Sequence, residues 1–105
     1  DETTELRDRL ADNTAYFRAG MTRLGFDILP GIHPIVPVML RDELRNVEMA
    51  KAVNDRGVYV VAFSFPVVPR GEARIRVQLS AAHTREHLDT ALSVFEDAGK
   101  QLGII

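Results

Sequence analysis

Cysteine is absent from this sequence of 105 residues, and its positive and negative charges nearly cancel. Without cysteine there is no disulfide framework, no thiolate nucleophile and no cysteine-based zinc site, which is compatible with the cytoplasmic location that we expect. Lys and Arg number 13 and Asp and Glu number 15, so the formal net charge at pH 7 is -2. Such a balance does not favour nucleic acid as a partner.

Long apolar runs are also missing. The longest run, Val58 to Phe63, is far shorter than the ~20 residues of a membrane-spanning helix, so we expect no membrane partner. The acidic start from Asp1 to Glu5 has the wrong chemistry for a signal peptide. Because the first residue is not methionine, we expect either a processed chain or a piece of a longer protein.

The length and composition are those of one globular domain. A chain of 105 residues can bury a single modest core. Hydrophobic residues make up 46% of the sequence and charged residues 27%, which excludes the disordered and fibrous classes. We therefore expect residues 1–105 to form a single domain.

Three stretches carry apolar residues at the spacing of an amphipathic helix. The first runs from about Thr4 to Leu24. The second runs from the N-cap Asp42 to about Arg56, and the third begins after the N-cap Thr84. The apolar stripes are Leu6, Leu10, Phe17, Met21 and Leu24 in the first, Leu44, Val47, Ala50 and Val53 in the second, and Leu88, Ala91, Leu92, Phe95, Ala98 and Leu102 in the third.

Four further stretches are predicted as strands. Phe26–Ile28 is short, and Ile35–Leu40 is expected to be an edge strand or to carry a bulge at Pro37, because proline removes a backbone donor. Val58–Phe63 is continuously apolar, which predicts a strand covered on both faces. Arg74–Ser80 alternates polar and apolar residues, the pattern of a half-buried strand.

The order of these elements predicts an α+β fold. Helices packed on one face of a small sheet are the economical way to bury the apolar stripes. Within the last strand, Arg74 and Arg76 share one face. An arginine fork matches a carboxylate bidentately, although polar residues on an amphipathic strand are also typical of a plain solvated face. The alternation alone leaves both interpretations open.

Two adjacent motifs resemble a known family. Pro66–Arg76 reads Pro-Val-Val-Pro-Arg-Gly-Glu-Ala-Arg-Ile-Arg, and Ser80–Thr84 reads Ser-Ala-Ala-His-Thr. Together they resemble the C-terminal signature of the α-oxoamine synthases, pyridoxal-phosphate enzymes that condense an amino acid with an acyl-CoA. The similarity extends to Pro34–Leu40, Gly57–Val60 and Gly99–Ile105. It is greatest to the glycine C-acetyltransferases, also called 2-amino-3-ketobutyrate CoA ligases.

This resemblance implies both a fold and a site. The fold is the C-terminal small domain of a fold-type I pyridoxal-phosphate transferase, with a mostly antiparallel sheet whose second face meets a larger domain. Arg76 matches the second arginine of the family's Arg-x-Arg motif, which binds the α-carboxylate of the amino-acid substrate. The full enzyme is expected to be a homodimer that takes glycine and acetyl-CoA as substrates.

The resemblance also implies that part of the enzyme is missing. The family's Schiff-base lysine lies in the large domain, and this chain has only Lys51 and Lys100, both on predicted helices outside any such motif. No stretch matches the groups that hold pyridoxal phosphate. We therefore expect a C-terminal fragment that has no catalytic or cofactor-binding residue of its own and is inactive alone.

Four other residues have weaker functional interpretations. The spacing of Arg74 assigns it no role beyond a solvated face. His83 could act as a general base, but a histidine there more often hydrogen-bonds near a helix start. Val67 and Val68 suggest a covering partner or an acyl-CoA channel, with packing on the domain's own helices equally open.

No metal site is expected, because the three histidines lack the spacing of metal ligands.

The reaction that this resemblance implies is the conversion of glycine and acetyl-CoA to 2-amino-3-oxobutyrate and CoA, a step of threonine breakdown. The alternative within the family is 8-amino-7-oxononanoate synthase, which uses alanine and a long acyl-CoA. A different class is a stand-alone carboxylate-binding or regulatory module in which Arg74 and Arg76 capture the ligand. A protein-interaction domain that uses Val67 and Val68 is the third possibility.

Overall fold

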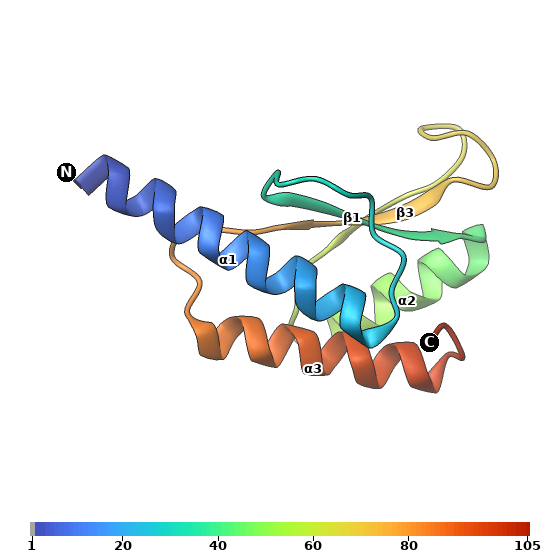
Figure 1. The fold of residues 1–105 in the computed structure, drawn as a ribbon. Helices are drawn as coiled ribbons and strands as arrows, with labels where there is room; N and C mark the ends of the chain where they lie inside the picture. Colours follow the sequence, from blue (N-terminus) through green and yellow to red (C-terminus); the bar gives the residue numbers. More distant parts are fainter. Residues whose placement is uncertain (1) are drawn as a thin grey trace.

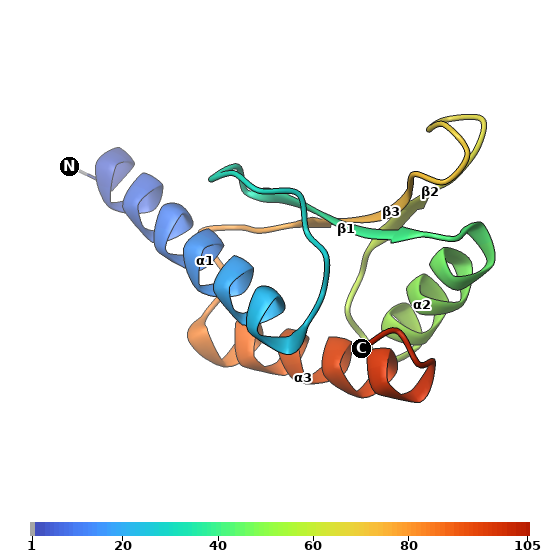
Figure 2. The same cartoon turned by 45° about the vertical axis from the view of Figure 1, so that its right-hand side comes forward.

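A three-stranded antiparallel sheet carries three helices on one of its faces. The computed structural model describes residues 2–105, and both Figure 1 and Figure 2 show the helices on the same side of the sheet. The strand order is β1-β3-β2. In chain order the elements are α1 (Glu2–Leu24), β1 (Ile35–Arg41), α2 (Glu43–Asp55), β2 (Val61–Phe63), β3 (Ala73–Gln78) and α3 (Arg85–Gln101). The predicted α+β architecture is confirmed.

The central strand β3 follows the predicted alternation. Ile75 and Val77 are buried on the sheet face that the helices cover, whereas Arg76 and Gln78 are exposed. Because directly paired residues of an antiparallel sheet point to the same face, Ile75 lies beside Val38 of β1 in the core. The open face of the sheet carries the polar residues of β3.

Three phenylalanines join the helices below the sheet. Phe95 of α3 is fully buried and makes edge-to-face contacts with Phe17 and Phe26, at centroid distances of 6.1 and 5.8 Å. Such aromatic pairs add to the free energy gained from area burial. The core therefore sits between the sheet and the α1–α3 pair.

Both predicted caps are present. The Asp42 side chain accepts a hydrogen bond from the backbone N–H of Arg45, so α2 begins where the sequence predicts. The Thr84 hydroxyl accepts from the N–H of His87, and His87 Nδ1 accepts from the N–H of Thr84. This reciprocal capping box starts α3 at the predicted position.

The predicted core face of α2 is wrong in part. Ala50 and Val53 are buried as expected, but Leu44 is 67% exposed and Val47 55% exposed. The buried positions are Asn46, Met49, Ala50 and Val53, an i, i+3, i+4, i+7 stripe. Asn46 therefore occupies a core position where the sequence predicts apolar residues. It can do so because its side-chain amide donates hydrogen bonds to backbone carbonyls of the sheet.

The apolar segment before the loop is a shorter strand than predicted. β2 begins only at Val61, and neither face is well covered, since the successive residues Val61 and Ala62, which point to opposite faces, are both exposed. The Asn54 side chain accepts from the N–H of Val60 at 2.8 Å and donates to its carbonyl at 3.4 Å. These bonds take the Val60 backbone out of the sheet ladder.

The first two predicted strands also differ in detail. β1 is an edge of the main sheet as expected, but Pro37 stands in regular register opposite Arg76. The irregularity falls instead between Met39 and Arg41, where Arg41 adopts a φ of 67°. The predicted strand Phe26–Ile28 is reduced to a single bridge to β1.

Candidate functional site

Arg76 lies on the face of the sheet opposite the three helices described above. Its paired residues on the neighbouring strands are Pro37 and Val61, both apolar. The guanidinium carbon lies 4.4 Å from the centroid of the Phe63 ring. Within residues 2–105, no carboxylate lies at ion-pair distance from Arg76. The structure thus presents a charged fork on an apolar face, an arrangement suited to an anionic ligand.

Arg74 shares this face but is engaged locally. Its Nη2 lies 3.5 Å from a carboxylate oxygen of Glu72, and its Nε donates to the Glu72 carbonyl at 3.1 Å. The side chain is 24% exposed, so much of it is packed. The two arginines of the motif therefore differ in environment, and only Arg76 offers an uncompensated charge.

The loop between β2 and β3 projects beyond the ends of these two strands (Figure 2). The Ser64 carbonyl accepts from the N–H groups of both Val67 and Val68, which forms its turn. Val67 is 73% exposed, whereas Val68 is half-buried. Val67 therefore does not pack on the helices of the described chain, which leaves the covering partner and the acyl-CoA channel as its predicted roles.

His83 organises the turn between β3 and α3. Its Nδ1 accepts a hydrogen bond from the N–H of Ser80 at 3.1 Å. The buried Asn13 of α1 donates from its amide to the carbonyls of Ser80 and His83, at 3.0 and 2.9 Å. This is the role near a helix start that the sequence favours for His83. No motif in the sequence points to Asn13, because an asparagine inside a predicted helix only weakens the helix's apolar stripe.

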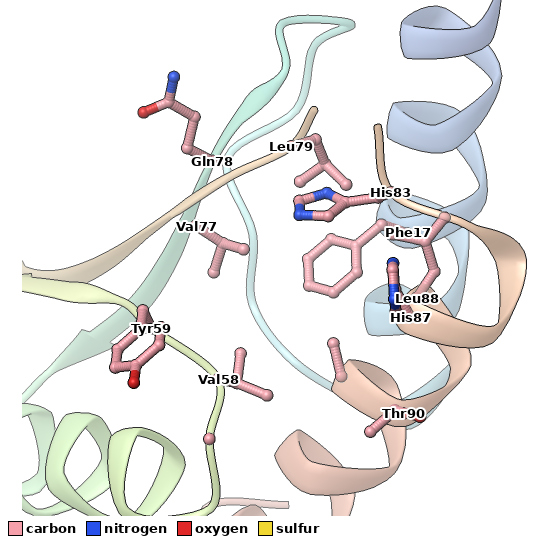
Figure 3. A pocket seen from close by; sticks show the side chains of 12 residues that line it. Phe17, Val58, Tyr59, Val77, Gln78, Leu79, His83, His87, Leu88 and Thr90 are labelled. Atoms are coloured by element: carbon pink, nitrogen blue, oxygen red, sulfur yellow. The ribbon is translucent and has the colours of Figure 1, made fainter. Parts of the chain in front are cut away.

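A cavity of about 550 Å³ lies beside this turn (Figure 3). His83 and His87 line one side of it, with ring centroids 6.2 Å apart, and Tyr59 lies across the cavity from them. Most of the remaining lining is apolar. Arg76 does not line this cavity, so the structure separates the histidines from the arginine of the motif.

The sequence of this chain matches a family of known enzymes. The family model described as aminotransferase class I and II matches residues 1–95. The 2-amino-3-ketobutyrate coenzyme A ligase of Escherichia coli K12 is 47% identical over 97% of this chain and 26% of its own length. The chain belongs to the α-oxoamine synthases. The resemblance of its motifs to this family, a branch of the class I and II aminotransferase fold, is confirmed.

Other α-oxoamine synthases match almost as well. The 8-amino-7-oxononanoate synthase of Thermosipho melanesiensis is 45% identical over 99% of this chain and 27% of its own length. A serine palmitoyltransferase structure from S. paucimobilis superposes with a TM-score of 0.92 at 32% identity, over 98% of this chain and 26% of that one. The chain therefore spans about a quarter of the length of these relatives, in which the fold is that of the C-terminal domain.

Pyridoxal phosphate is the cofactor of this enzyme family. The part of the chain that the structure describes does not fit it, because both lysines form exposed ion pairs on helix surfaces. Lys51 Nζ lies 2.7 Å from Asp55, and Lys100 Nζ lies 2.9 Å from Glu96. Neither is placed to form a Schiff base.

Proposed function

We propose that this chain is the C-terminal domain of a glycine C-acetyltransferase. The enzyme would condense glycine with acetyl-CoA to give 2-amino-3-oxobutyrate and CoA, a step of threonine breakdown. The observation that carries the proposal is Arg76, a fork without a carboxylate partner in residues 2–105, on the open face of the sheet. The matches to 2-amino-3-ketobutyrate CoA ligases at 47% and 48% identity support the choice of substrates.

In this proposal Arg76 recognises the carboxylate of glycine. A bidentate arginine–carboxylate pair fixes the orientation of the bound amino acid as well as its affinity. Fixing the carboxylate determines which bond to the α-carbon faces the cofactor, and this orientation governs the loss of the α-proton. The residues that hold the cofactor would come from the remainder of the enzyme, and the fragment alone would be inactive.

The open sheet face supports the proposed domain arrangement. Val61 pairs with Arg76 on this face and is 58% exposed, and Val67 of the adjoining loop is 73% exposed. A soluble enzyme rarely leaves such apolar surface uncovered. The remaining three quarters of the relatives' length is the natural cover, since this chain spans only 26% of the ligase. We further propose a cytoplasmic homodimer. No helix in residues 2–105 is long and apolar enough to cross a membrane.

The test is substitution of Arg76 in the full-length enzyme. Arg76→Ala should weaken glycine binding by about 1.5 to 3 kcal/mol, the usual contribution of a charged hydrogen bond. Arg76→Lys should not restore full activity, because an ammonium group cannot form the planar fork. Arg74→Ala is the matched control and should leave glycine binding nearly unchanged. A glycine dependence unaffected by Arg76→Ala would overturn the proposal.

The second candidate is 8-amino-7-oxononanoate synthase. The match to the Thermosipho melanesiensis enzyme, at 45% identity, is close to that of the ligases. Steady-state rates with glycine and with alanine, each paired with acetyl-CoA and with a long acyl-CoA, would separate the two. A preference for alanine and the long thioester would replace the first assignment with the second.

A further inference from the structure

Phe63 and Arg76 form a pair across the open face of the sheet. Phe63 stands opposite Arg74 in the β2–β3 register, and Arg76 lies two residues farther along the same face of β3. This is the diagonal relationship in which aromatic and long side chains reach one another. The Arg76 guanidinium carbon lies 4.4 Å from the ring centroid, within the distance of a cation–π contact.

The contact with Phe63 leaves the N–H groups of the Arg76 guanidinium free. An aromatic ring beside a guanidinium holds the orientation of the guanidinium plane and does not use the N–H donors, which remain available for a carboxylate. A free arginine side chain samples many rotamers and loses that freedom when it grips a ligand. Contact with Phe63 removes part of that loss before the ligand arrives, which is preorganisation.

The Phe63 backbone is itself held from below the sheet. Asn46 of α2 is fully buried, and its Nδ2 donates to the carbonyls of Phe63 at 3.1 Å and Arg74 at 3.3 Å. These two carbonyls belong to the last residue pair of the β2–β3 ladder. The Asn46 amide therefore joins both strands at the root of the loop, next to the Phe63–Arg76 pair.

We propose that Phe63 is a positioning residue for Arg76, and that Asn46 fixes Phe63 in place. The inference rests on the proposed function, in which Arg76 binds the glycine carboxylate. Phe63 does not touch the reacting atoms. It sets the plane of the fork, so its loss affects capture of the amino acid and leaves use of the acyl-CoA unchanged.

The experiment compares variants of the full-length enzyme. Phe63→Leu should raise the KM for glycine about 3- to 10-fold, with kcat and the KM for acetyl-CoA within about twofold, as expected for loss of one cation–π contact. Phe63→Tyr and Phe63→Trp keep a ring beside Arg76 and should restore the KM for glycine to within about twofold. Glycine affinity, titrated through the absorbance of the bound cofactor, should follow the same order.

Tyr16→Leu is the matched control, because it removes the ring 3.7 Å from Arg85 in the helix layer. It should leave the KM for glycine unchanged even where it lowers the melting temperature. Should Phe63→Leu not fold, Phe63→Met replaces it. A normal KM for glycine in the ring-less variant, or no rescue by Tyr and Trp, would overturn the inference. If Arg76→Ala is impaired in the same assay, either of these outcomes rejects only the role of Phe63, and the proposed function stands.

Discussion

Gly20 of α1 faces Leu92 of α3 so closely that a methyl group on Gly20 would lie 2.6 Å from Leu92 Cδ1 and 2.8 Å from Cδ2. Glycine inside a helix costs about 1 kcal/mol relative to alanine, so its presence there needs a reason. Close packing supplies that reason, because both residues are buried in the contact between the two helices. The missing side chain at Gly20 thus makes the space that the Leu92 side chain fills.

Gly20→Ala should therefore lower the free energy of unfolding by about 1 to 3 kcal/mol, the usual effect of overpacking a core. Adding Leu92→Val should recover part of that loss, since the shorter side chain withdraws from the new methyl group. Denaturant unfolding of the two single variants and the double variant gives the coupling energy between the sites. A more stable Gly20→Ala protein would show that helix propensity outweighs packing at this position.

The capping box of α3 predicts a graded response. Thr84→Ala removes the hydroxyl that accepts from His87 N–H and should cost about 0.5 to 2 kcal/mol. His87→Gln keeps an acceptor for the Thr84 N–H and should be nearly neutral, whereas His87→Leu leaves that donor unpaired. Thermal unfolding of the three variants tests the order. Equal losses for Gln and Leu at position 87 would exclude the reciprocal bond.

Asn46 predicts an unusual intolerance of aspartate. Its Nδ2 faces the Phe63 and Arg74 carbonyls and the Ser64 hydroxyl, and its Oδ1 is buried without a partner in the described chain. Asn46→Asp would replace the donor with an oxygen that faces other oxygens, and should cost about 3 kcal/mol or more. Asn46→Ala, which buries no new polar atom, should cost less.

Asn54→Asp is the matched control for that experiment. The exposed Asn54 lies two turns later on α2, and its Oδ1 already accepts from the Val60 N–H. An aspartate keeps this acceptor and loses only the long 3.4 Å bond from Nδ2 to the Val60 carbonyl at an exposed position, so the change in unfolding free energy should stay below about 1 kcal/mol. Chemical denaturation of both variants provides the comparison, and similar losses at the two positions would contradict the role assigned to the Asn46 amide.

The open sheet face predicts that some exposed residues are buried in the full-length enzyme. Val61 pairs with Arg76 on this face and is 58% exposed in residues 2–105, yet Val61→Lys should destabilise the full-length enzyme by about 2 kcal/mol or more, because it would bury a charge under the remaining domain. Val47→Lys, on the outer side of α2, should be almost neutral. Melting temperatures of both variants measure the difference. Equal, small effects would mean that the sheet face stays open to solvent.

Local patterns account for the features that were predicted correctly. Alternation in Arg74–Ser80 assigns β3 and its two faces, and the side chains of Asp42 and Thr84 bind N–H groups only three residues away. Each of these features depends on neighbours in the chain, so the order of residues is sufficient to specify it. The motif resemblance also singles out Arg76 from local sequence, and its role in carboxylate binding stays a prediction.

Contacts between distant segments account for the rest. Asn13 meets residues 67 and 70 positions away, and Asn46 reaches across 17 and 28 positions to Phe63 and Arg74. An asparagine in a helix carries no sign of which carbonyl it will bind, and its burial is decided only when the helix packs on the sheet. The pairing of Phe63 with Arg76 likewise depends on the β2–β3 register, because only the register makes the two residues diagonal neighbours.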